Sequence, residues 1–315
     1  MKVLITGACG YVGSSLTPYL LNKGHHISSF DTEWFGNDLP IHPNLRHQKK
    51  DIRDMDEADF EGIERVIHLA NIANDPGVEL NPTLSWEVNV LATHKLAELS
   101  KRSDVQQFIY ASSGSVYGVK EEEHVTEELS LVPISVYNKT KMVSERVLLS
   151  YEKDMKIINV RPATVCGFSP RMRLDVSVNL LTFLALKNKE ITVFGGDQVR
   201  PNIHMKDMIS VYEHFLNNLE DIPSGNYNAG FENISILDIA KKVAKKINAE
   251  ITISPSNDPR SYRQNSDKLL LTGFTQSYSV ENAIDDVIKS YNNGDFVEED
   301  RFYTVKTMKN INLDK

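Results

Sequence analysis

Residues 2–13, with the sequence KVLITGACGYVG, decide the fold. The apolar run at residues 2–6 is rich in β-branched side chains and predicts a short buried strand. Gly7, Gly10 and Gly13 follow, and a helical pattern then continues to Lys23. A tight turn from strand to helix needs glycine, and backbone N–H groups at the helix start can bind a pyrophosphate when no side chain intervenes. The stretch predicts a dinucleotide-binding turn, although spaced glycines also occur in a plain βαβ turn.

An acid at the end of the next strand indicates which dinucleotide is bound. Residues 26–31, HISSFD, form this second predicted strand and end on Asp31. A carboxylate at this position can accept hydrogen bonds from both ribose hydroxyls of an adenosine, and it repels a 2′-phosphate. The sequence therefore favours NAD over NADP. Pro18 lies inside the first predicted helix, where it is expected to kink or break it.

Strands and helices alternate through the first half of the chain. Strands are predicted at 65–71, 107–113 and 156–163, with helices at 86–101 and 137–151. This alternation is typical of an α/β fold with a doubly wound parallel sheet. After residue 163 the pattern becomes irregular, and a smaller second lobe is expected. Further helices are predicted at 205–219, 235–248 and 280–291, and the tail from residue 296 lacks periodicity and is expected to be loosely held.

The composition narrows the class of protein. The 315 residues are 41% hydrophobic and 25% charged, with a net charge of −8, which argues against nucleic acid or a membrane surface as a partner. No run approaches the roughly 20 apolar residues of a membrane span. The only cysteines, Cys9 and Cys166, suit a reducing compartment, and the N-terminus lacks a signal-peptide pattern. A cytoplasmic protein is therefore expected.

Tyr137 and Lys141 predict the chemistry. They lie four residues apart on the predicted helix 137–151, so they share one face. A free tyrosine has a pKa of about 10, and a nearby ammonium together with a positive nicotinamide ring would lower it. The phenolate could then take a proton from a sugar hydroxyl while hydride leaves for NAD. Tyr19 and Lys23 have the same spacing, but Tyr137 is distinguished because its helix follows the strand that bears the serines.

The order of seven short motifs resembles that of one family. The motifs are GACGYVG (7–13), Asp31, Asp51–Ile52, HLAN (68–71), SSGSVYG (112–118), YNKTK (137–141) and RPATVCG (161–167). They are similar to the extended short-chain dehydrogenase/reductase family, and more narrowly to its sugar-nucleotide epimerase/dehydratase branch. The similarity extends from Lys2 to about Tyr291, and the motifs are specific jointly rather than singly.

The resemblance implies an organisation, a cofactor and a partner. It implies an NAD-binding Rossmann domain at residues 1–165, to which residues 204–230 return. A nucleotide-sugar-binding lobe at 166–203 and 231–295 and a tail at 296–315 complete the chain. It also implies a nucleotide-diphosphate sugar as substrate and a homodimer formed through the helices at 86–101 and 137–151. The cofactor-binding residues would be Gly7, Gly10, Tyr11, Val12, Gly13, Asp31, Asp51, Ile52, Leu69, Ala70, Asn89, Tyr137 and Lys141.

The resemblance also selects one of the serines. The family's catalytic Ser or Thr lies four residues before the Tyr of V-Y-G, which is Ser113 here. Its hydroxyl would donate to the sugar oxygen that becomes a carbonyl. Ser115 would point to the same side if the strand continued, and could be a second substrate contact, whereas Ser112 points away and is interpreted as structural. The alternative is a small-residue strand end that lets the nicotinamide approach.

Gly114 and Ser115 occupy the positions at which the family's dehydratases carry acids. Loss of water across C5–C6 needs a general acid for the leaving hydroxide and a base at C5. The family's decarboxylases usually keep a Glu there. Dehydration and decarboxylation are therefore disfavoured, and redox at one carbon remains. The hydride either returns to the other face of the sugar, as in C4 epimerisation, or the oxidised or reduced sugar is released.

Four arginines are candidates for substrate binding. Arg200 and Arg260 match phosphate-binding arginines of the family, and a guanidinium suits a diphosphate. Arg171 and Arg173 lie in SPRMRLD (169–175), which resembles a sub-branch of surface-polysaccharide pathways that includes enzymes oxidising GDP-heptose at C4. Solvated arginines in ordinary loops are the alternative for all four.

These observations favour an NAD-dependent nucleotide-sugar epimerase acting at C4. Tyr137 would be the base, Lys141 would lower its pKa and hold the nicotinamide ribose, and Ser113 would orient the sugar oxygen. The enzymatic alternative is a 4-dehydrogenase or 4-ketoreductase with exchangeable NAD(H). The alternative outside enzymes is a non-catalytic dinucleotide-binding protein. No metal site is expected, because no two of the nine histidines stand three or four apart on a predicted helix.

Overall fold

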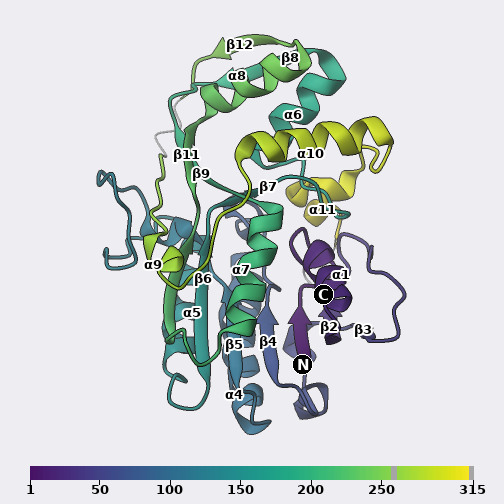
Figure 1. The fold of residues 1–315 in the computed structure, drawn as a ribbon, viewed down its shortest axis with the longest axis vertical. Coiled ribbons are helices and arrows are strands. Elements are labelled where there is room, and N and C mark those ends of the chain that lie inside the picture. The colour runs from purple at the N-terminus through teal and green to yellow at the C-terminus, as the bar shows by residue number, and fades with distance from the viewer. Residues whose placement is uncertain (257–260, 312–315) are drawn as a thin grey trace.

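The computed structural model describes residues 1–256 and 261–311. Its largest unit is a seven-stranded parallel sheet in the order β10-β6-β5-β4-β1-β2-β3, with helices on both faces (Figure 1). The predicted α/β doubly wound sheet is thereby confirmed. The strand order reverses between β1 and β4, where such folds leave a ligand-binding crevice. The strands are β1 (Lys2–Thr6), β2 (His26–Asp31), β3 (Leu45–Lys49), β4 (Arg65–His68), β5 (Gln107–Ala111), β6 (Lys156–Pro162) and β10 (Gly225–Ala229).

Each face of this sheet has its own apolar core. Val3 and Ile5 of β1 pack toward α1 (Gly13–Asn22) and α7 (Met205–Asn217), whereas Leu4 packs toward α4 (Thr93–Arg102) and α5 (Val136–Leu149). Successive side chains of a strand point to opposite faces, so a strand covered on both faces needs apolar residues throughout. This explains the uninterrupted apolar run that opens the chain.

A smaller lobe lies above the carboxyl ends of the large sheet in Figure 1. Its core includes Ile191, Ile239, Val243 and Ile284. After β9 and α7 the chain returns to the large sheet, where β10 pairs with β6. The lobe contains β7 (Thr164–Cys166), β8 (Glu190–Phe194), β9 (Val199–His204), β11 (Glu232–Ser235), β12 (Glu250–Ser254), α6 (Ser177–Asn188), α8 (Ile236–Ile247) and α10 (Val280–Asn293).

Short helical segments complete the described chain. In the part of the chain that the structure describes, no helix has both the length and the apolarity needed to cross a lipid bilayer. The short segments are η1 (Ile52–Asp54), η2 (Glu57–Phe60), α2 (Asp75–Val78), α3 (Pro82–Trp86), the π-helix η3 (Glu87–Ala92), η4 (Gly114–Tyr117), α9 (Asp267–Leu270), η5 (Asp300–Phe302) and α11 (Thr304–Asn310).

The structure differs from local expectations at three places. Helix α1 is not broken at Pro18, because Leu16 and Leu20 are buried against the sheet on either side of the lost hydrogen bond. The edge strand β3 was not predicted, since its sequence LRHQK is polar. The tail is not loosely held: it forms η5 and α11, and Phe302 and Met308 are only 1% and 2% exposed.

Candidate functional site

A cavity of about 1010 Å³ lies where the carboxyl ends of the large sheet meet the smaller lobe and α11. Its size is at the upper end for small-molecule sites, as expected for a large ligand or for two ligands. Most of the predicted site residues line it. They are Gly7, Gly10, Tyr11, Val12, Gly13, Asp31, Asp51, Ile52, Leu69, Ala70, Ser113, Ser115, Tyr137, Lys141, Arg171, Arg173 and Arg200.

Among the described residues, one predicted site residue, Asn89, does not line the cavity. Arg260 lies outside the described residues. Asn89 is fully buried in η3, where its amide bonds the backbone of Ile72 and the hydroxyl of Thr140. Asn89 therefore supports the cavity wall beside α5 from behind, rather than lining the cavity as expected.

The glycine turn leaves no room for side chains. Gly7 has a φ of +74°, and a Cβ there would lie 2.6 Å from the backbone nitrogen of Ala70. A Cβ on Gly13 would lie 2.3 Å from the carbonyl oxygen of Gly7. The phenol of Tyr11 points away and donates to the carbonyl of Gly167 at 2.6 Å. The turn thus presents backbone at the start of α1, which is the surface that a pyrophosphate requires.

Asp31 is held in position at the end of β2. Its carboxylate accepts hydrogen bonds from the backbone N–H groups of Cys9 and Glu33, at 2.9 and 2.7 Å. Burial raises the pKa of Asp31, and these two N–H groups oppose that shift. Asp51, farther along the cavity, forms an ion pair with Arg53 at 3.0 Å. A carboxylate that follows β2 and faces the cavity fits the ribose of an adenosine, so the chain's residues fit an NAD-type cofactor.

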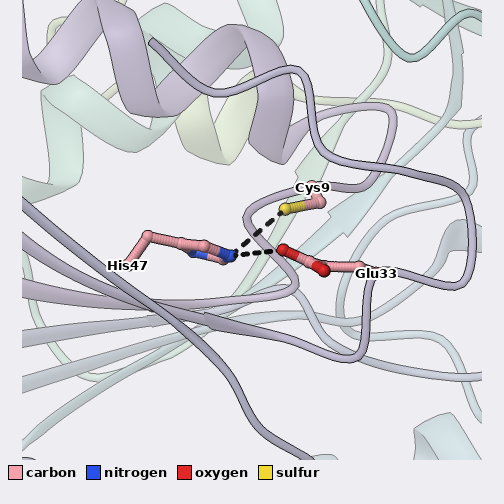
Figure 2. Close-up of side chains that lie close together, drawn as sticks. All are labelled: Cys9, Glu33 and His47. Carbon is pink, nitrogen blue, oxygen red and sulfur yellow. Dashed lines mark hydrogen bonds and ion pairs between the residues drawn. The ribbon is translucent and has the colours of Figure 1, made fainter. Parts of the chain in front are cut away.

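Cys9, Glu33 and His47 meet beside this carboxylate (Figure 2). The Nε2 atom of His47 lies 3.9 Å from the Cys9 sulfur and 3.1 Å from the Glu33 carboxylate, and its Nδ1 bonds Ser29. The sequence analysis expected no metal site and did not connect these three potential ligands, which come from three separate segments. Burial, and then the charge of Asp31, raise the pKa of the Cys9 thiol, so the sulfur is a neutral thiol here.

The serines lie beyond the end of strand β5, whereas the predicted strand extended to residue 113. Strand β5 stops at Ala111, and Ser113 is the N-cap of η4. The hydroxyls of Ser113 and Ser115 nevertheless lie 2.7 Å apart, because the turn of η4 brings them together, and Ser115 donates to Asn138 at 2.6 Å. Ser112 points the other way, into the core, where it donates to Glu145.

Tyr137 and Lys141 lie together on α5, at the cavity. Burial raises the pKa of Tyr137 to about 12, and a hydrogen bond with Ser113 opposes the rise. Burial lowers the pKa of Lys141 to about 7, against the charge of Glu145. The Nζ of Lys141 donates to the carbonyl of Ala111 at 2.6 Å. The low tyrosine pKa that the sequence analysis expected is therefore not a property of the protein alone, because burial dominates.

The sequence analysis missed part of the cavity wall. Phe35, Asp75 and Tyr212 line it, as do Thr304 and Lys306 of α11. Asp75 accepts a hydrogen bond from Ser135, the N-cap of α5, at 2.6 Å. Tyr212 lies on the long helix α7, and its role at the cavity depends on how that helix packs. The other four residues belong to a loop or to the short helices α2 and α11, and no periodic pattern marks such segments in a sequence.

Comparisons with known proteins show which family the chain resembles. Residues 3–230 match the NAD dependent epimerase/dehydratase family. An uncharacterized UDP-glucose epimerase of Bacillus subtilis, YtcB, is 32% identical over 234 residues, which are 66% of this chain and 70% of that protein. A UDP-glucose 4-epimerase of Lactobacillus helveticus is 27% identical over 296 residues, or 85% of this chain and 89% of that protein.

A solved structure shares the fold across nearly the whole chain. It is UDP-glucuronic acid 4-epimerase from Bacillus cereus in complex with UDP-glucuronic acid and NAD, with a TM-score of 0.82 and 27% identity. The match covers 93% of this chain and 99% of that one. The resemblance to enzymes that oxidise GDP-heptose stays a prediction. Because the family match covers most of the chain and the cavity fits the dinucleotide, the chain belongs to the NAD-dependent epimerase/dehydratase family.

Proposed function

We propose that this protein is a UDP-sugar 4-epimerase that uses NAD and regenerates it in each turnover. The observation that carries the proposal is the juxtaposition of Ser113, Tyr137 and Lys141 at the cavity, beside a glycine turn suited to the cofactor. The relatives named as 4-epimerases of UDP-glucose and UDP-glucuronic acid support the choice of UDP and of C4.

Tyr137 is the residue that moves the proton. In the protein alone its phenol keeps the proton at neutral pH, because burial raises its pKa. Bound oxidised NAD supplies a hydride acceptor and a positive charge. A nearby positive charge would lower the pKa of the phenol, and the Tyr137 phenolate could then accept the proton of the sugar C4 hydroxyl and later return it. Ser113 would donate to the same sugar oxygen and orient it. Lys141, whose Nζ lies 5.9 Å from the centre of the Tyr137 ring, would add positive charge when it is protonated.

The residues next to Ser113 support epimerisation rather than dehydration. Gly114 and Ser115 cannot ionise usefully, and Ser115 is engaged with Asn138. Four carboxylates line the described cavity. Asp51 is paired with Arg53 and Asp175 with Arg173, whereas Asp31 accepts hydrogen bonds from backbone N–H groups and Asp75 accepts a hydrogen bond from Ser135. Because neither residue that follows Ser113 is an acid, reduction from the other face of the sugar is the step that we expect.

The test is a set of incubations of the purified protein with UDP-glucose, UDP-galactose and the two corresponding UDP-uronic acids. Products are identified by NMR, and reduced nicotinamide is followed by absorbance. We expect an equilibrium mixture of C4 epimers without added cofactor and without net NADH. Turnover that requires added NAD(H) and yields or consumes a keto sugar would instead identify a 4-dehydrogenase or 4-ketoreductase. No conversion of any UDP-sugar would contradict the proposal.

We also infer a homodimer formed through the outer surface of α3, α4 and α5. The exposed apolar side chains Trp86 and Leu91 lie on this helical region, next to the ring contact of His94 with Tyr151. Light scattering should give twice the mass of the chain. Leu91→Glu should yield monomers, whereas Leu271→Glu, a control at another exposed leucine, should not. A monomeric wild-type protein would contradict the inference.

We assign NAD binding to residues 1–165 and 204–230 and substrate binding to residues 166–203 and 231–295. The pairing of β10 with β6 supports the return of the chain to the cofactor domain. We propose a cytoplasmic location, which is supported by two buried cysteines that form no disulfide among the described residues.

A further inference from the structure

Arg171 is a buried cation that forms no ion pair with a carboxylate among the described residues. Its side chain is 2% exposed, and its Nε has no hydrogen-bond partner among the described residues. One Nη donates to Thr304 at 3.3 Å, and the guanidinium stacks over the ring of Phe35 at 4.0 Å. Asp175, an acid whose charge acts on Arg171, is already paired with Arg173 at 2.8 Å. Burying an unpaired charge is costly, so such a group is expected to meet an anion when a ligand binds.

The contacts of Arg171 place it at the cofactor end of the cavity. Its backbone N–H donates to the hydroxyl of Ser14, in the first turn of α1, at 3.3 Å. Phe35 follows Asp31 in the loop after β2. Ser14 therefore marks the pyrophosphate end of α1, and Phe35 marks the adenosine side. Arg173, by contrast, lies near enough to Tyr137 for its charge to lower the pKa of that phenol.

We propose that Arg171 binds the pyrophosphate of NAD and reaches it from the substrate lobe. This departs from the sequence analysis, which grouped Arg171 with Arg173 as a substrate ligand. It rests on NAD as the cofactor and, for the control ligand below, on the proposed UDP-sugar substrate. A guanidinium on one side and the backbone N–H groups of α1 on the other would hold the diphosphate between the two lobes.

The C-terminal strap, residues 299–310, holds Arg171 in this position. Arg301 anchors one end of the strap through an ion pair with Asp38 at 2.6 Å. The backbone N–H of Thr304 donates to Asp175 at 2.9 Å. Met308 anchors the other end by packing near Gly77 of α2. The strap thus spans the cavity from the loop after β2, which contains Asp38, to α2. Its Thr304 hydroxyl orients the guanidinium of Arg171.

The test compares two variants with opposite expected selectivity, Arg171→Met and Arg200→Met. Each full-length protein is freed of bound nucleotide and titrated calorimetrically with ADP, which carries the adenosine and pyrophosphate of NAD, and with UDP. Loss of a charge-assisted contact predicts roughly ten- to hundredfold weaker ADP binding by Arg171→Met, with UDP binding nearly unchanged. Arg200→Met should show the reverse pattern. Thr304→Val should weaken ADP binding severalfold.

The opposite selectivity would overturn the proposal. If Arg171→Met weakened UDP binding and left ADP binding unchanged, Arg171 would belong to the substrate. Failure of UDP to bind any of the proteins would count against the proposed substrate and leave the ADP comparison intact. As a measurement that does not depend on titration, the amount of NAD that copurifies should fall in Arg171→Met.

Thermal unfolding separates ligand binding from a structural role. Because methionine removes an unpaired buried charge, nucleotide-free Arg171→Met should unfold at a temperature equal to or above that of the wild type. Added NAD should raise that temperature less than it does for the wild type. A lower unfolding temperature without nucleotide, together with an unchanged NAD effect, would assign Arg171 a structural role and contradict the proposal.

Discussion

Ser112 and Ser113 are adjacent in the chain, yet they belong to two polar networks of opposite kind. Ser112 donates to Glu145, which forms an ion pair with Arg161 at 2.7 Å, and both charged side chains are almost fully buried. Ser113 faces the cavity, where Lys141 is buried with no ion pair among the described residues. The network behind β5 pairs its charges, whereas the network in front leaves cations unpaired.

Paired buried charges belong to the architecture of the fold, whereas unpaired buried cations indicate a functional site. A paired buried charge has its partner supplied by the fold, and removing one member leaves the other uncompensated. An unpaired buried cation destabilises the protein alone and is expected where a ligand or a reaction needs positive charge. Arg161 belongs to the first kind, and Arg171 and Lys141 belong to the second. Substitutions in the two networks should therefore change different measurements.

Of these substitutions, Tyr137→Phe should produce the largest effect, and it should change turnover but not stability. Removing the phenol oxygen removes the group that moves the proton, so kcat should fall about 10²- to 10⁴-fold. The thermal midpoint should stay close to that of the wild type. Tyr19→Phe is the matched control, because Tyr19 and Lys23 have the same spacing on α1 and bond Glu213 outside the cavity. Turnover of Tyr137→Phe within a few-fold of the wild type would refute the assigned base.

Glu145→Leu should produce the largest effect on stability. It leaves Arg161 buried and unpaired, so the free energy of unfolding should fall by about 3–5 kcal/mol. Equilibrium unfolding in urea measures this. The double variant Glu145→Leu/Arg161→Met should recover much of the loss, because it removes both charges. If the double variant were as unstable as the single one, the ion pair between Glu145 and Arg161 would not be the source of the network's contribution to the free energy of unfolding.

The two serines provide the sharpest contrast between neighbouring positions. Ser113→Ala removes a donor to the reacting oxygen and should lower kcat roughly 10²-fold, with little change in stability. Ser112→Ala removes a buried hydrogen bond to Glu145 and should lower the free energy of unfolding by about 1–3 kcal/mol, with little change in kcat. If both alanine variants changed the same measurement, the division into two networks would be wrong.

The unpaired Lys141 should make the stability of NAD-free protein depend on pH. The pKa of Lys141 is lowered to about 7 in the folded chain, against about 10.4 in an unfolded one. Between these values the unfolded chain binds more protons, so stability should rise with pH, by at most about 1.4 kcal/mol per unit. Lys141→Met should remove this rise between pH 7 and pH 9. Parallel wild-type and variant curves from urea unfolding at pH 7, 8 and 9 would contradict the lowered pKa of Lys141.

Local patterns in the sequence predicted the features that depend on local structure. The glycine turn, Asp31 and the spacing of Tyr137 and Lys141 each depend on one strand or one helix, and all of these residues line the cavity. The alternation of strands and helices predicted the parallel sheet for the same reason. In each case the residues that define the feature are close together in the chain, so a short stretch of sequence is enough to predict it.

The features that the sequence did not reveal depend on distant contacts. Thr304 reaches Arg171 across 133 positions, and α11 has only seven residues, too few for a periodic pattern. Cys9 and His47 meet only because β2 and β3 pair beside the glycine turn. The burial of Asn89 depends on Ile72 and Thr140, which come from two other elements. Tertiary packing alone determines these positions.

The place of β10 in the sheet has a consequence for synthesis. This edge strand, Gly225–Ala229, pairs with β6 but comes after α6, β8 and β9 of the small lobe. While the chain emerges from the ribosome, the cofactor sheet therefore stays one strand short until residue 229 is available, and β6 presents an open edge meanwhile. Residues 166–203 of the second lobe are therefore synthesised before the first lobe receives its last strand, and a single cut in the chain cannot separate the two lobes.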